Sequence, residues 1–323
     1  MSSSSSFTSP CSSSVSPATD SPAARATAPS VSRPAAAALC CLVAAGLLWG
    51  TGGLTGTLLG RAAGASPLFV AALRLLVGGG LIIVFRVAPR RRWPIGRAAW
   101  TRVTVTGLLA ATFQAAYFSA VSLTSVSLAT LITIGGAPVI VTVAEAVLGR
   151  KRLSRSSLGT TALALAGLGL LIGLPAGGFG PAALLAGIGL ALLASSGFAT
   201  LTLISPSPVP GLDVEAVTGI GFALGGLGLL PLAALVGGLT FRPSVSTIGL
   251  LAALGVGPTA VAYTLYFRGL RAAPASTGAL LSLLEPLTAT ILGVFLLGNQ
   301  LSQAGVAGAV LLAIAVAAGA RAR

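Results

Sequence analysis

The sequence predicts an all-α integral membrane protein, with ten transmembrane helices arranged as two inverted five-helix repeats. Composition is the first observation: of 323 residues, 55% are hydrophobic and 7% are charged, with a mean hydropathy of +0.99. Soluble domains carry roughly 25% charged residues, so this composition indicates a chain that resides in the lipid bilayer. The second observation is a series of apolar runs, and the third is an internal repeat.

Each apolar run is about 20 residues long, the length that crosses some 30 Å of hydrocarbon. The ten runs cover residues 36–59, 67–87, 103–121, 126–148, 156–174, 182–204, 214–236, 247–267, 276–297 and 303–320. Residues 1–34 are rich in Ser, Pro and Ala and cannot bury enough apolar surface to fold, so we expect a disordered cytoplasmic tail. The first repeat then covers residues 35–174 and the second residues 182–320.

One copy of the internal repeat starts near the end of the third run and the other at the end of the eighth run. The loops within the two copies differ in charge. Tyr117-Phe118 corresponds to Tyr266-Phe267, and Leu-Gly-Arg-Lys-Arg-Leu-Ser at 148–154 corresponds to Leu-Gly-Asn-Gln-Leu-Ser at 297–302. Positively charged loops stay in the cytoplasm, so the cationic and the neutral loop belong on opposite sides of the membrane. Two copies with opposite orientation form an inverted repeat, an architecture of secondary transporters.

The basic residues predict the orientation of the whole chain. With a cytoplasmic N-terminus, Arg61 and Arg242 fall outside and sixteen basic residues fall inside. These sixteen are Arg25, Arg33, Arg86, Arg90, Arg91, Arg92, Arg97, Arg102, Arg150, Lys151, Arg152, Arg155, Arg268, Arg271, Arg321 and Arg323. Both termini are therefore expected in the cytoplasm, although the inside loop at 205–213 carries no basic residue. A single lysine beside abundant Arg, Ala and Gly is typical of a GC-rich bacterial genome, and hence of a bacterial cell membrane.

Other functional classes fit the composition poorly. The net charge of +14 comes from basic residues that punctuate apolar runs, which argues against nucleic-acid binding. No histidine is present and Asp20 and Asp213 lie outside the runs, so we expect no metal site, no cofactor and no intramembrane enzyme. A channel would need rings of like residues, which the few intramembrane charges do not supply. The expected partners are the lipid bilayer and a small-molecule substrate, and the oligomeric state is left open.

Charged residues inside the runs are the first candidates for a site, because each costs at least about 2.5 kcal/mol to insert. Arg74 and Glu285 lie near the middle of the second and ninth runs. Either they face a water-filled cavity, with Arg74 binding a substrate carboxylate and Glu285 an amine or a transported proton, or they only snorkel or hold helices together. Glu145 lies near the end of its run, where we expect an interfacial ion pair with Arg150 or Lys151.

Two prolines occupy corresponding places in the two repeats. Pro138 and Pro286 lie near the middle of the fourth and ninth runs. Proline removes a backbone donor, and matching interruptions in two halves indicate a transporter's binding site. A structural kink without a binding role is the alternative.

Amphipathic side chains complete the predicted site. Gln114 and Tyr117 share one face of the third run, and Tyr263 and Tyr266 share one face of the eighth. Trp49 lies midway through the first run, where its indole N–H needs a partner. These residues are candidates for lining the cavity, while Tyr117 and Tyr266 could instead anchor the helices at the membrane interface.

Taken in order, several short motifs resemble the drug/metabolite transporter superfamily, and specifically its ten-helix EamA-type exporters. The motifs are Leu-Leu-Trp-Gly at 47–50, Ala-Leu-Arg-Leu-Leu at 72–76, Leu-Glu-Pro-Leu-Thr-Ala at 284–289 and Leu-Gly-x-x-Leu-Ser after the ninth run. The sequence departs from that family after the fourth and ninth runs, where Gly149-Arg150 and Gly298-Asn299 replace its usual Gly-Glu.

The resemblance implies a secondary active transporter whose central cavity opens alternately to the two sides and exports amino acids or related metabolites. Glu285 is then the leading candidate for proton coupling, because a low-dielectric site disfavours the charged form of a carboxyl group. The alternative is a nucleotide-sugar or lipid-precursor carrier of the same superfamily. Its phosphorylated substrate would need more than one cation deep in the membrane, and Arg74 is the only basic residue near the middle of a run, since Arg86 lies at the end of the second run.

Overall fold

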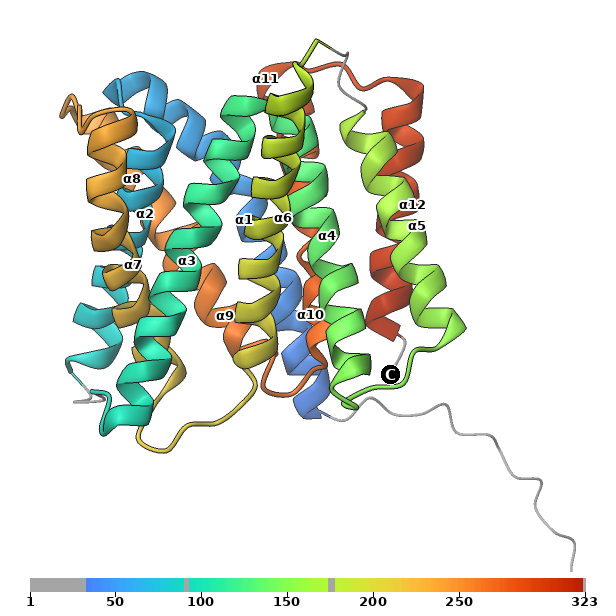
Figure 1. Cartoon of the computed structure of the whole chain (residues 1–323), viewed down its shortest axis with the longest axis horizontal. Helices are drawn as coiled ribbons and strands as arrows, with labels where there is room; N and C mark the ends of the chain where they lie inside the picture. The colour runs from blue at the N-terminus through green and yellow to red at the C-terminus, as the bar shows by residue number, and fades with distance from the viewer. Residues whose placement is uncertain (1–32, 90–92, 174–177, 322–323) are drawn as a thin grey trace, which may run out of the picture. The chain divides into compact units, whose positions relative to one another are not determined.

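The computed structural model describes residues 33–89, 93–173 and 178–321 and consists of helices joined by short segments (Figure 1). In chain order these are α1 (Arg33–Ala63), α2 (Pro67–Ile82), η1 (Ile83–Val87), α3 (Arg97–Leu123), α4 (Val126–Val147), α5 (Arg155–Ile172), α6 (Pro181–Ile204), α7 (Val214–Val236), α8 (Val245–Gly255), η2 (Val256–Val261), α9 (Ala262–Gly269), α10 (Ala275–Leu281), α11 (Leu284–Leu297) and α12 (Gln303–Arg321). The expected tail at 1–34 lies outside the described residues, except that residues 33 and 34 begin α1.

Within these ranges, ten helical segments are long and apolar enough to cross a membrane, which confirms the predicted helical membrane fold. They run side by side, and the start of α1 and the end of α12 lie at the same end of the bundle (Figure 1). We call this the terminal end.

Local sequence signals fix where several helices begin and end. Five spans start after a serine whose hydroxyl oxygen accepts the backbone N–H three residues later, and these serines are Ser66, Ser125, Ser154, Ser244 and Ser302. Gly149 and Gly298, in the two Leu-Gly loops of the repeat, have φ angles of 67° and 68°. This left-handed conformation suits glycine, so both copies of the motif end a helix by the same backbone geometry.

The ninth span is interrupted and the fourth is not. α10 ends at Leu281 and α11 begins at Leu284, so the break lies just before Glu285 and Pro286. α4, in contrast, continues through Pro138 without interruption. The expected matching break at Pro138 is therefore absent, because proline can be accommodated within a helix whose neighbours compensate for the missing donor.

Close backbone contacts hold the helices together. α2 packs against α7, α5 against α12, and α3 against α6, while α9 packs against α1. When the first five spans are interchanged with the last five, the α2–α7 and α5–α12 contacts map onto themselves and the α3–α6 contact maps onto the α9–α1 contact, as expected for two related halves. Glycine permits the closest approaches: a Cβ on Gly107 of α3 would lie 2.5 Å from the carbonyl oxygen of Gly221 in α7.

Candidate functional site

A cluster of aromatic rings lies in the buried core of the bundle. The Trp49 ring from α1 lies 4.9 Å from that of Tyr263 and 4.8 Å from that of Tyr266, both on α9. Phe198 from α6 stacks on Tyr266 at 5.7 Å, and Phe222 from α7 meets Tyr263 edge-on at 4.6 Å. Three of the predicted site residues therefore share one core: Trp49 from the first span, and Tyr263 and Tyr266 from the eighth.

Tyr117 belongs to the edge of this cluster rather than its centre. Its ring stacks on Phe113 at 6.5 Å, and Phe113 lies 5.8 Å from Phe198. The Tyr117 hydroxyl is 2.9 Å from that of Thr130 in α4, and the Tyr266 hydroxyl is likewise 2.9 Å from that of Thr202 in α6. The hydroxyl groups of both tyrosines thus bond to neighbouring helices, which disfavours the alternative of interfacial anchors, for Tyr266 above all, since only 1% of it is exposed.

Some polar groups in this core lack partners. Trp49 is 5% exposed, and its indole Nε1 is a buried donor without a hydrogen bond among the described residues. Gln114 is 4% exposed, and no hydrogen bond joins its amide to another described residue. Since most buried polar groups are hydrogen-bonded, these two side chains offer unused bonding capacity beside the aromatic rings.

Glu285 begins the second half of the interrupted span. Its backbone N–H donates to the Ser282 carbonyl at 2.9 Å, and its side chain is partly buried. In the described part of the chain the carboxyl group has neither a hydrogen bond nor an ion pair. α1 approaches closely here, because a Cβ on Gly50 would lie 2.9 Å from the Glu285 carbonyl oxygen.

Arg74 is positioned by a helix irregularity that the sequence analysis did not single out. Pro258 lies in η2 and cannot donate to the carbonyl of Leu254, one turn earlier. The Thr259 hydroxyl donates to that carbonyl at 2.8 Å, and Arg74 Nε donates to the Thr259 oxygen at 3.4 Å. A proline inside a predicted span was the available signal for this site.

The interpretation of Glu145 as an interfacial ion pair is wrong. This side chain is 6% exposed, and its two carboxylate oxygens accept the backbone N–H groups of Ala275 at 3.0 Å and Ser276 at 3.3 Å. Arg150 instead donates to a backbone carbonyl of α6, and Lys151 donates to the Ser276 hydroxyl. Glu145 therefore joins α4 to the start of α10, because the free N–H groups of a helix start attract a carboxylate.

Glu215 is an acidic residue that the sequence analysis did not single out. It lies in the first turn of α7, is 6% exposed, and forms ion pairs with Arg86 of η1 and Arg268 of α9. The available signal was an acidic residue just inside a predicted run. This triad connects the second, seventh and eighth spans at the terminal end.

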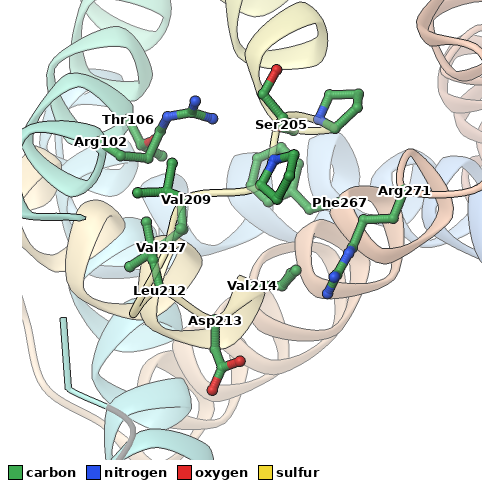
Figure 2. Close-up of a pocket in the computed structure, with 13 residues that line it drawn as sticks. Arg102, Thr106, Ser205, Val209, Leu212, Asp213, Val214, Val217, Phe267 and Arg271 are labelled. Atoms are coloured by element: carbon green, nitrogen blue, oxygen red, sulfur yellow. The ribbon is translucent and has the colours of Figure 1, made fainter. Parts of the chain in front are cut away.

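A small pocket of about 60 Å³ also opens at the terminal end, beneath the segment at 205–213. Figure 2 shows Arg102 and Arg271 on opposite sides of it. Arg102 also donates to the Ile204 carbonyl at 2.5 Å, so basic side chains from other segments flank a loop that has none of its own. None of the predicted site residues lines this pocket.

Three comparisons with known proteins agree with this architecture. The sequence model of the EamA-like transporter family matches residues 36–173 and 185–318. The chain is 34% identical over 264 residues to the uncharacterized transporter YwfM of Bacillus subtilis (strain 168), covering 80% of this chain and 85% of that protein. A solved crystal structure shares the fold with a TM-score of 0.73 at 24% identity, covering 88% of this chain and 96% of that one.

Proposed function

The chain belongs to the EamA-like transporter family, and we propose that it is a proton-coupled secondary transporter that exports amino acids or related amphipathic metabolites by alternating access. The observation that carries the proposal is Glu285. A carboxyl group at the break of a membrane span, without a partner among the described residues, is available to bind a proton or an amine. Its neighbours supply the rest of a substrate site.

The surrounding chemistry suits a small zwitterion with an apolar part. Among the described residues, Arg74 has no ion pair with Glu285 and donates only its Nε–H, to Thr259, so its terminal N–H groups remain available to donate to a substrate carboxylate. Trp49 and Tyr263 contribute aromatic surface, and the indole N–H of Trp49 supplies a donor. The side chain of Gln114 adds a further donor and acceptor.

Contacts at the terminal end support a closed gate on that side. Glu145 ties α4 to α10, Thr202 on α6 bonds Tyr266 on α9, and the Glu215 triad joins η1, α7 and α9. The Glu145 contact and the Glu215 triad connect spans of the first half to spans of the second half, whereas the Thr202–Tyr266 bond joins two spans of the second half. In the proposed cycle, these contacts break when the site opens to the cytoplasm.

The proposed membrane is the bacterial cell membrane, with the terminal end in the cytoplasm. Most basic residues of the described chain belong to that end, whereas Arg61 and Arg242 lie at the opposite one.

The test is the Glu285→Gln variant, purified and reconstituted into proteoliposomes. Wild-type protein should take up members of an isotope-labelled amino-acid mixture when a proton gradient is imposed, and Glu285→Gln should abolish this uptake. Glu285→Asp keeps a titratable group and should retain part of it, and both variants should fold because the carboxyl group has no bonded partner among the described residues. Transport by Glu285→Gln at the wild-type rate with unchanged pH dependence would assign Glu285 a structural role only.

A further inference from the structure

A second feature lies on the outer surface of the bundle, away from the aromatic cluster. A groove of about 410 Å³ runs between the end of α2 with η1 on one side and η2 with α9 on the other. Its wall includes Phe85, 68% exposed, Val256, 46% exposed, and Val261, 41% exposed. These side chains belong to membrane spans, so the groove faces lipid.

The groove ends at two arginines. Arg86 and Arg268 both line it, and each side chain is 41% exposed. Both guanidinium groups bond to the same oxygen, Oε1, of Glu215. Two positive charges facing one negative charge leave a net positive charge, and each guanidinium has five N–H donors, so most donors remain available to a further anion.

The length and the chemistry of the groove fit a lipid rather than a soluble anion. Val256 and Arg268 are twelve positions apart, which corresponds to roughly 18 Å at 1.5 Å per residue. One leaflet contains about 15 Å of hydrocarbon, half the thickness of the bilayer core. The apolar wall therefore matches an acyl chain, while guanidinium groups bind phosphate oxygens well.

We propose that this groove binds one anionic phospholipid of the leaflet at the terminal end, with the phosphate against Arg86 and Arg268 and an acyl chain along the apolar wall. The lipid contacts η1 from the first half of the chain and α9 from the second half. Its binding stabilises the arrangement in which these segments are held together at this end. The inference goes beyond the proposed transport reaction, and only its assignment to the cytoplasmic leaflet, where anionic lipids gather, rests on the proposed orientation.

The test measures lipid binding to the purified full-length protein by native mass spectrometry, with thermal stability as a second readout. Dioleoyl phosphatidylglycerol is compared with dioleoyl phosphatidylcholine, which has the same chains and a zwitterionic headgroup. Wild-type protein should bind phosphatidylglycerol more tightly and gain stability from it. Equal binding and equal stabilisation by the two lipids would overturn the proposal.

Three variants locate the binding. R86Q/E215Q/R268Q removes the cations without leaving Glu215 unpaired, and it should weaken phosphatidylglycerol binding at least about fivefold, as expected for the loss of one net positive charge near an anionic lipid. A260F places a phenyl ring in the apolar part of the groove and should weaken lipid binding, while it leaves the arginines in place. The matched control R61Q/R242Q removes two arginines from the opposite end and should bind as the wild type does.

Other results would contradict the groove as the site. Wild-type phosphatidylglycerol binding by the triple variant would show that the arginines do not bind the headgroup. Loss of binding in the triple variant but not in A260F would show that surface charge attracts the lipid without the apolar wall. R268Q alone provides the same comparison if the triple variant does not insert. Glu285→Gln should bind phosphatidylglycerol normally, so a failure of the proposed transport function is distinguishable from a failure of this inference.

Discussion

At the scale of single residues, the polar groups of the aromatic cluster fall into two kinds. The hydroxyl groups of Tyr117 and Tyr266 bond to threonines on adjacent helices, so they help to fix the positions of those helices. Trp49 and Glu285 present side-chain groups without partners among the described residues. An unmet buried donor costs roughly 1–3 kcal/mol, so such groups are retained at a cost in stability that a ligand-binding role would explain.

Trp49→Phe separates a packing role from a binding role. The substitution keeps an aromatic ring and removes the unpartnered indole N–H. Loss of that donor offsets the loss of ring area, so thermal stability should change by less than about 1 kcal/mol, while substrate affinity should fall about tenfold for one lost hydrogen bond. Phe222→Leu provides a packing control, because the Phe222 ring on α7 contacts the Tyr263 ring. Unchanged affinity together with a large loss of stability in Trp49→Phe would contradict the binding role.

The sequence predicted which residues lie in the core better than it predicted their partners. Trp49 and Tyr263 could be selected because large amphipathic side chains in the middle of a span need a protein or water partner. Glu145 was misread because its basic neighbours in sequence suggested an ion pair, whereas its carboxylate meets the start of α10, about 130 residues later. Glu215 was overlooked because its two arginines come from other spans, and local spacing carries no information about such contacts.

At the scale of elements, the interruption of the ninth span determines the site. Residues 282 and 283 separate α10 from α11, which places Glu285 in the first turn of a new helix. The sequence indicated this position through Pro286, yet the equivalent Pro138 lies inside a continuous helix. The neighbours of the two spans do not explain the difference, because the packing of α11 along α1 and of α4 along α6 are equivalent contacts in the two halves.

Gly50→Ala tests the contact of α1 with α11. A Cβ at this position would lie 2.4 Å from Cβ of Thr288, so the two helices must move apart. Such overpacking costs about 1–3 kcal/mol, and it should also lower transport by displacing Glu285. Gly53→Ala is the matched control, because no atom lies within 4 Å of its added Cβ. Alanine there should be neutral or stabilising by up to about 1 kcal/mol, as expected in a helix interior. Equal stability of the two variants would contradict the close contact.

At the scale of the whole molecule, two independent features of the sequence agree on how the chain crosses the membrane. Apolar runs give an even number of spans, and the structure correspondingly brings the start of α1 and the end of α12 to one end (Figure 1). Basic residues concentrate at that same end. The uncharged segment at 205–213 was the exception in the charge pattern, and Arg102 and Arg271 flank it in space (Figure 2).

The orientation itself is the last prediction. Sixteen basic residues on one side against two on the other strongly favour cytoplasmic termini, because positively charged segments resist translocation. Green fluorescent protein fused after Arg323 should therefore fluoresce, and alkaline phosphatase at the same position should be inactive. The matched control is a fusion after Gly238, between α7 and α8, where the phosphatase should be active because seven spans precede it. An active phosphatase after Arg323 would reverse the orientation. It would move the Glu215 triad and its arginines to the outer face and remove the basis for a cytoplasmic gate, while the groove between η1 and η2 could still be tested as a lipid site in the opposite leaflet.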